Sequence, residues 1–90
     1  MSLEQVLSSR PRLKILMMLV QLGELNVSEI ARRLGTNYDA TSKHLKILED
    51  EGILQHKTFG RIRLYRLNPQ STKTKALQTL IETWEQSEKA

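Results

Sequence analysis

The sequence predicts a mainly α-helical domain with one small β-hairpin, in the order helix, helix, helix, helix, strand, strand, helix. Its 90 residues are 39% apolar and 27% charged, which is typical of one small globular domain. Apolar residues recur at helical spacing in segments that end at glycine, and after Gly52 the spacing changes toward alternation. We therefore expect residues 1–90 to form a single domain.

The composition excludes several classes of protein. The chain has no cysteine, which excludes a disulfide framework, a thiolate metal site and a cysteine nucleophile. Its longest apolar run, residues 15–20, is far shorter than the roughly 18–20 residues that a membrane span needs. No basic segment followed by an apolar one opens the chain, so we expect no secretory signal and a cytoplasmic location.

Two helices are expected before Gly23. Ser9 is placed to cap the second of them, and Pro11 suits its first turn, where a missing N–H costs nothing. This helix runs to Leu22, and its apolar stripe is too broad for a surface helix, so we expect it at the centre of the core. The shorter helix before it has an apolar face formed by Leu3, Val6 and Leu7.

A short helix over residues 27–34 is expected next. Asn26 and Glu29 have the spacing of a capping box. Gly35 suits the left-handed residue that ends many helices. The apolar face of this helix is formed by Val27, Ile30, Ala31 and Leu34.

Another helix begins almost at once, capped by Thr36 or Asn37, and runs to Glu51. Its inner stripe is Thr41, Leu45 and Leu48. Its opposite face is rich in short hydrogen-bonding and charged residues: Asp39, Ser42, Lys43, Lys46 and Asp50. Two helices joined by a short turn with glycine form a helix-turn-helix. A four-helix bundle also contains such helical hairpins, but it does not require so polar an outer face.

Residues 53–68 are expected to form the hairpin, with its tip at Gly60–Arg61. This segment holds four basic residues and no acid, so it alone matches the whole net charge of +4. It is either a charged surface hairpin or a loop that contacts phosphates. Ile62 and Leu64 share one face of the second strand, Tyr65 and Leu67 the other, and the pattern leaves the inward face open.

A last helix is expected from between Pro69 and Thr74 to about Glu88. Its apolar residues, at positions i, i+3, i+4 and i+7, are Leu77, Leu80, Ile81 and Trp84.

The order helix, helix-turn-helix, basic hairpin, helix is that of the winged helix-turn-helix. Four stretches also resemble the arsenic-repressor-like (ArsR-type) family of bacterial and archaeal transcription regulators. They are SRPRLKIL at 9–16, VSEIARRLG at 27–35, ATSKHLKILEDEGIL at 40–54, and the wing with GR at 60–61 and YRLNP at 65–69. The resemblance implies a helix-turn-helix at about 27–51, a wing at about 53–68 and a C-terminal dimerisation helix at about 70–88.

The departures from this family argue against metal sensing. Many metal-sensing members have two cysteines at the entrance of the motif, where this chain has Asn26 and Ser28. The other metal site known in the family uses histidine and acidic residues on the last helix, which has no histidine here. His44 and His56, the only histidines, lie elsewhere. We therefore expect no metal or other cofactor, and the residues identify no effector.

The resemblance implies double-stranded DNA as a partner, with helix 38–51 in the major groove. Near the bases we expect Tyr38, Asp39, Ser42 and Lys43, with Lys46 on a base or a phosphate. Phosphates and the flanking minor groove are assigned to Arg32, Arg33, Lys57, Arg61 and Arg63. Of Lys57, Arg63 and Arg66, at most two share one side of an alternating hairpin. The acidic run 49–51 should point away from the duplex.

Structural alternatives stand beside these assignments. Tyr38 is equally suited to pack against the preceding helix, and Asp39 to serve as a helix cap. Arg32 and Arg33 also fit a solvated face. His44 is better read as a partly buried residue of the motif than as a switch.

We expect a homodimer, because one chain offers one recognition helix and operators are commonly two-fold. The expected interface is formed by Leu3, Val6, Leu7, Leu77, Leu80, Ile81 and Trp84. The alternative is that Trp84 folds back and caps the core of its own chain.

The leading hypothesis is therefore a homodimeric, sequence-specific DNA-binding transcription regulator, and a repressor rather than an activator. A second hypothesis is a winged-helix module for chromatin packing or protein interaction without sequence preference. An enzyme is not expected, because two isolated histidines and no phosphate-binding loop supply no recognisable catalytic constellation.

Overall fold

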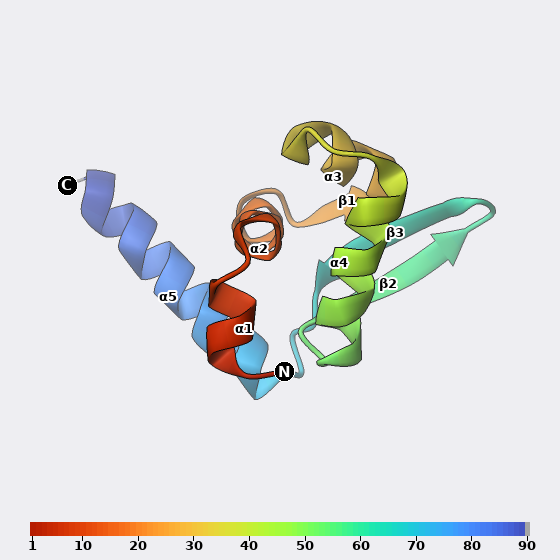
Figure 1. Ribbon diagram of the computed structural model, residues 1–90. Helices are drawn as coiled ribbons and strands as arrows, with labels where there is room; N and C mark the ends of the chain where they lie inside the picture. The colour runs from red at the N-terminus through yellow and green to blue at the C-terminus, as the bar shows by residue number, and fades with distance from the viewer. Residues whose placement is uncertain (90) are drawn as a thin grey trace.

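The computed structural model describes residues 1–89, which form five helices and three strands (Figure 1). In chain order they are α1 (Leu3–Leu7), α2 (Arg10–Leu22), β1 (Glu24–Asn26), α3 (Val27–Leu34), α4 (Tyr38–Asp50), β2 (Leu54–Phe59), β3 (Ile62–Leu67) and α5 (Thr72–Lys89). The β2–β3 hairpin and the far end of α5 extend from opposite sides of the body. The predicted helices and the predicted hairpin are all present.

The structure contains side-chain caps at the predicted starts of the helices. The Ser9 hydroxyl accepts a hydrogen bond from the Arg12 amide (3.3 Å) at the start of α2. Asn37, rather than Thr36, caps α4, since its side-chain oxygen accepts from the Ala40 amide (2.8 Å). Gly35 ends α3 with φ of 73°, a left-handed conformation that residues with a Cβ rarely adopt.

The capping box predicted at the start of α3 is only half formed. The Asn26 side-chain oxygen accepts from the Glu29 amide at 2.8 Å, as predicted. The Glu29 carboxylate does not return to the Asn26 backbone but binds the guanidinium groups of Arg32 and Arg33. Charge-assisted bonds to two arginines are stronger than a bond to one neutral amide, which explains the difference.

The sheet has three strands instead of the predicted two. β1 pairs antiparallel with β3, with Leu25 opposite Tyr65, and the strand order is β1–β3–β2. Three residues are too few to show a strand period, and β1 depends on a partner forty residues away. The hairpin itself has the predicted tip, since Phe59 pairs with Ile62 across Gly60 and Arg61.

The inward face of the hairpin, which the sequence left open, is the face of Tyr65 and Leu67. Tyr65 is buried and Leu67 is half-buried, whereas Ile62 on the opposite face is 52% exposed. Leu25 packs on the same core side as Tyr65, because the two residues are partners across β1 and β3. The third strand therefore decides which face turns inward.

The core lies between α2, the helix-turn-helix and the inner face of the sheet. As expected, α2 is central, and its residues Ile15, Leu16 and Leu19 are buried. Leu22 at its end is 48% exposed, so the broad stripe is not buried throughout. From the other elements the core takes Val6, Val27, Ile30, Leu45, Leu48, Ile53, Leu54, Tyr65, Leu77 and Ile81.

Among the helices of residues 1–89, none is both long and apolar enough to cross a bilayer.

Candidate nucleic-acid interface

The outer face of α4 is exposed because its inner stripe anchors the helix. Thr41, Leu45 and Leu48 are fully buried, as predicted. The Thr41 hydroxyl donates to the Asn37 carbonyl (2.8 Å), so its burial leaves no polar group unpaired. The side chains on the opposite side project into solvent, and those that are exposed are Tyr38, Asp39, Lys43, Lys46 and Asp50.

Arg63 of the hairpin joins the wing to the first half of α4. Its Nη2 donates to the Ser42 hydroxyl at 3.0 Å and to the Tyr38 hydroxyl at 3.4 Å. The guanidinium also lies 6.0 Å from the centre of the Tyr65 ring, within the range of a cation–π contact. The hydrogen bond to Tyr38 raises the pKa of Arg63 above its ordinary value. Three of the predicted DNA-contact residues therefore form one cluster.

Tyr38 lies between two elements. The residue is 44% exposed. It lines a small cavity of about 120 Å³ together with the start of α3, including Ser28, and with Arg61 and Arg63 of the wing. Tyr38 thus faces both the motif entrance and the wing.

Asp39 does not cap α4, because Asn37 has that role. Asp39 is exposed in the first turn, where a negative charge is favourable for the helix dipole. Lys46 lies 3.6 Å from Asp50 across one turn of the same helix, and both side chains are exposed. An exposed pair of this kind contributes little to stability, so Lys46 remains available to another anion.

The basic residues of the hairpin are divided between its two faces. Lys57 and Arg66 point to the outer face, and Arg63 points to the inner face toward α4. This matches the expectation that at most two of the three share a side. Arg61 is exposed at the tip. Lys57 and Arg61 form no ion pair with any carboxylate of residues 1–89.

Arg32 and Arg33 are partly neutralised by a neighbour on their own helix. Both bind the carboxylate of Glu29, Arg33 through its Nε at 2.8 Å. The hydrogen bond from Arg32, with that from Arg33, lowers the pKa of Glu29 to about 2. The arrangement favours the solvated-face alternative for these two arginines.

Most of the acidic run after Leu48 is bound by other parts of the chain. Glu49 contacts the His56 ring and accepts from the Tyr65 hydroxyl (3.5 Å), and burial raises the pKa of Tyr65. Glu51 contacts the amino group of Met1. Glu49 and Glu51 lie at the C-terminal end of α4, and Glu49 is connected to Arg63 through Tyr65.

His44 is partly buried, as expected, on the side of α4 that faces α2. Its Nδ1 lies 3.4 Å from Nη1 of Arg12, whose Nη2 donates to the Gln5 carbonyl at 2.9 Å. Burial, and then the charge of Arg12, lower the pKa of His44. His44 is therefore neutral at pH 7, and Arg12 links α1, α2 and α4.

Sequence reasoning assigned no role to Arg10 and Lys14. Both line a surface cavity of about 210 Å³ that also includes Thr36, Ala40 and His44. The available signal was the excess of basic over acidic residues in the first 22 positions, where Glu4 is the only acid.

The residues expected at a dimer interface fall into two groups. Val6, Leu77 and Ile81 are buried within the chain itself, and Leu7 is half-buried. The second group is exposed to solvent: Leu3 is 64% exposed, Leu80 48% and Trp84 65%. Trp84 lies beside Leu7 and Leu13 of its own chain but is 65% exposed, so it does not close over the core as the alternative expected.

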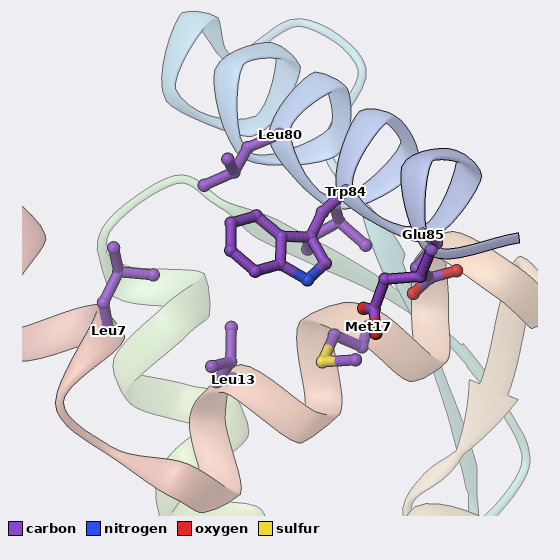
Figure 2. A pocket seen from close by; sticks show the side chains of 8 residues that line it. Leu7, Leu13, Met17, Leu80, Trp84 and Glu85 are labelled. Carbon is purple, nitrogen blue, oxygen red and sulfur yellow. The ribbon is translucent and has the colours of Figure 1, made fainter. Parts of the chain in front are cut away.

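Trp84 and Leu80 border an apolar cavity of about 300 Å³ between α5 and the first two helices (Figure 2). Leu7 and Leu13 lie across this cavity from the indole ring. A neighbouring cavity of about 340 Å³ shares Leu7 and Leu80 and extends to Leu3. The two cavities form one continuous apolar surface, here called the α1/α5 surface.

The motif entrance does not suit a thiophilic metal. Asn26 and Ser28 offer no thiolate, and the Asn26 side-chain oxygen already caps α3. Within residues 1–89, no three His, Asp or Glu side chains come together as metal ligands.

The exposed recognition helix, the preceding helix and the basic wing define a winged helix-turn-helix protein of the DNA-binding class. Solved structures of this class superpose well on the chain. HlyU from Vibrio cholerae N16961 gives a TM-score of 0.78 at 32% identity, covering 91% of this chain and 86% of HlyU. The homodimeric winged helix-turn-helix DNA-binding domain Mb0332 from Mycobacterium bovis gives a TM-score of 0.73 at 28% identity. The superposition covers 91% of this chain and 73% of the Mb0332 chain.

Residues 10–56, more than half of the chain, match the family model for bacterial regulatory proteins of the arsR family. The chain is also 34% identical over 65 residues to the arsenical resistance operon repressor of Escherichia coli K12. That alignment covers 72% of this chain and 56% of the repressor's own length. The chain belongs to the ArsR family of bacterial regulatory proteins, which are transcription regulators rather than enzymes, and it has the winged helix-turn-helix fold.

Proposed function

We propose that this protein is a homodimeric repressor that binds a pseudo-palindromic site in double-stranded DNA. In each protomer α4 enters the major groove, and the wing contacts the flanking minor groove and phosphates. Helix-turn-helix proteins bind DNA in this way with the first half of the second motif helix nearest the bases.

The Arg63 cluster is the observation that carries this proposal. Its bonds to Ser42 and Tyr38 hold the wing beside the half of α4 that would contact the bases. The acids of the run 49–51 lie at the other end of the helix. One surface therefore combines an exposed helix face with the basic wing. Double-stranded DNA fits this surface, because its groove accepts the helix and its phosphates attract the basic wing.

The proposed contacts follow from exposure and pairing. Ser42 and Lys43 are the best placed to contact base edges. Lys43 is on the exposed face of α4, and Ser42 lies at the edge of that face, where it accepts a hydrogen bond from Arg63. Arg61, at the tip and free of carboxylate partners among residues 1–89, suits the minor groove. The remaining proposed base or phosphate contacts are Tyr38, Asp39, Lys46, Lys57 and, more weakly because of Glu29, Arg32 and Arg33.

The proposed homodimer forms through the α1/α5 surface. Leu3, Leu80 and Trp84 are exposed apolar side chains on this surface, and neighbouring exposed apolar side chains of this kind can mark a contact with another protein. The related Mb0332 domain is described as homodimeric, and the related arsenical resistance protein as a repressor. A two-fold dimer predicts half-sites about one helical turn apart, roughly 34–36 Å.

The decisive experiment is selection of bound sequences from random duplexes, followed by titration of the selected site. Specific binding should lose about 1–3 kcal/mol for each altered base pair in the site. Equal affinity for selected and random duplexes would overturn sequence specificity and favour a packing module. Failure to bind any duplex at low salt would favour a protein-interaction module.

The assignment of the recognition face is tested by Lys43→Gln, with Lys75→Gln as its control. Lys75 is exposed on α5 and its loss changes the net charge by the same amount. We expect Lys43→Gln to weaken binding to the selected site and to relax discrimination at one base pair, while Lys75→Gln changes neither. Unchanged binding by Lys43→Gln would refute this assignment. A reporter with the site inside its promoter should be silenced by the wild type, whereas increased expression would contradict repression.

A further inference from the structure

Arg10 and Lys14 form a second exposed basic surface, separate from the wing. Both lie in the first turns of α2, at the rim of the cavity of about 210 Å³ that includes Thr36 and Ala40. No acidic residue borders this cavity. Neither cation forms an ion pair with a carboxylate of residues 1–89. The charge of this surface is therefore uncompensated.

This basic surface and the wing flank α4 on opposite sides. Ala40 and His44 face the cavity beside α2, and Tyr38 and Ser42 face the wing. At about 100° per residue, these two pairs lie roughly 160° apart around the helix. Lys43 lies between them on the exposed side. Figure 1 shows the same order, with α2 and the β2–β3 hairpin on either side of α4.

A helix in the major groove has one sugar–phosphate backbone on each side, because the groove is only about 12 Å wide. The wing can reach the backbone on its own side of α4. The backbone on the other side then lies nearest to the start of α2 and the turn between α3 and α4. The uncompensated cations are found at this position.

We propose that Arg10 and Lys14 bind backbone phosphates of the DNA on the side of α4 away from the wing, with the Thr36 hydroxyl as a neutral partner. This inference rests on the proposed function, since it assumes that α4 enters the groove. His44 contributes no charge at neutral pH, because its pKa is lowered. The phosphates are therefore bound by the two exposed cations, with the charge of Arg12 behind them.

The salt dependence of binding tests this inference. The logarithm of the binding constant falls with the logarithm of salt concentration by about 0.9 for each phosphate neutralised on B-DNA. A dimer carries each substitution twice, so Lys14→Gln or Arg10→Gln should reduce the slope by about 1.8. Lys75→Gln is the matched control. Lys14→Arg keeps the positive charge and should therefore keep the wild-type slope. Circular dichroism of each variant checks that the helices are intact.

The outcomes separate this inference from the proposed function. Slopes for both glutamine variants that equal those of wild type and Lys75→Gln would overturn it, even if binding is sequence-specific. A reduced slope on random and selected duplexes alike would support it, even if no sequence preference exists. Because phosphates carry no sequence information, the loss in affinity should be uniform across sites. A loss confined to particular base pairs would therefore also count against it.

Discussion

Replacing Trp84 by alanine tests the proposed dimer. The expected loss of dimer stability follows from the exposed area of the Trp84 side chain. An aromatic side chain buries up to about 250 Å². Trp84 is 65% exposed, so a partner covers up to about 160 Å² of it, worth about 4 kcal/mol at ~25 cal/mol per Å². The substitution removes two indoles from a symmetric dimer, so the loss is at most about 8 kcal/mol. With half of this exposed area covered by the partner, we expect a loss of about 4 kcal/mol, which is a rise of ~1,000-fold in the dissociation constant.

Sedimentation equilibrium over a wide range of concentrations measures this change. Leu80→Ala and Leu22→Ala form a matched pair, because both leucines are 48% exposed and only Leu80 borders the α1/α5 surface. We expect Leu80→Ala to weaken the dimer and Leu22→Ala to leave it unchanged. A Trp84→Ala protein that dimerises within threefold of the wild type would refute the reasoning, as would equal effects of the two leucine substitutions.

Three further predictions concern stability. Thr74→Val should cost about 1 kcal/mol in urea unfolding, because it removes a buried hydrogen bond of 2.9 Å to the Ile53 carbonyl and keeps the shape of the side chain. Gly35→Ala should cost about 1–2 kcal/mol, since φ is 73° and an added Cβ meets no atom within 4 Å, so only backbone strain opposes it. The lowered pKa of His44 means that the unfolded chain binds more protons below pH 6.5, so stability should fall as the pH drops through that value.

A control or a contradicting result is available for each of the three. Thr79→Val, exposed on the same helix as Thr74, should leave the urea midpoint unchanged. For Gly35, equal stability of the alanine variant would show that the turn between α3 and α4 relaxes. His44→Gln should reduce the loss of stability between pH 8 and pH 5, and an identical pH profile for the variant would contradict the role assigned to His44.

Local interactions made the helices predictable. Ser9 and Asn37 cap their helices through backbone amides three residues ahead, and Gly35 supplies the left-handed turn, so each signal lies within a few residues. The polar outer face of α4 was equally visible, because burial of one stripe at helical spacing leaves the rest exposed.

Contacts between distant residues were not predictable from these patterns. β1 exists only because Leu25 pairs with Tyr65, and that same pairing decides which face of the hairpin turns inward. Arg63 is one basic residue among four in the wing, and only the register of the strands brings it to Ser42. The excess of basic residues near the start of the chain was likewise not enough to assign a role to Arg10 and Lys14, because only the structure shows that α2 lies beside α4.

The short strand β1 has a consequence for the entropy of binding. Asn26 pairs with Leu64 in the sheet and is also the residue that caps α3. The wing is therefore fastened at its base to the start of the motif and, through Arg63, to α4. In the proposed complex, the position of the wing relative to the recognition helix is therefore fixed before DNA binds, which lowers the entropy cost of binding.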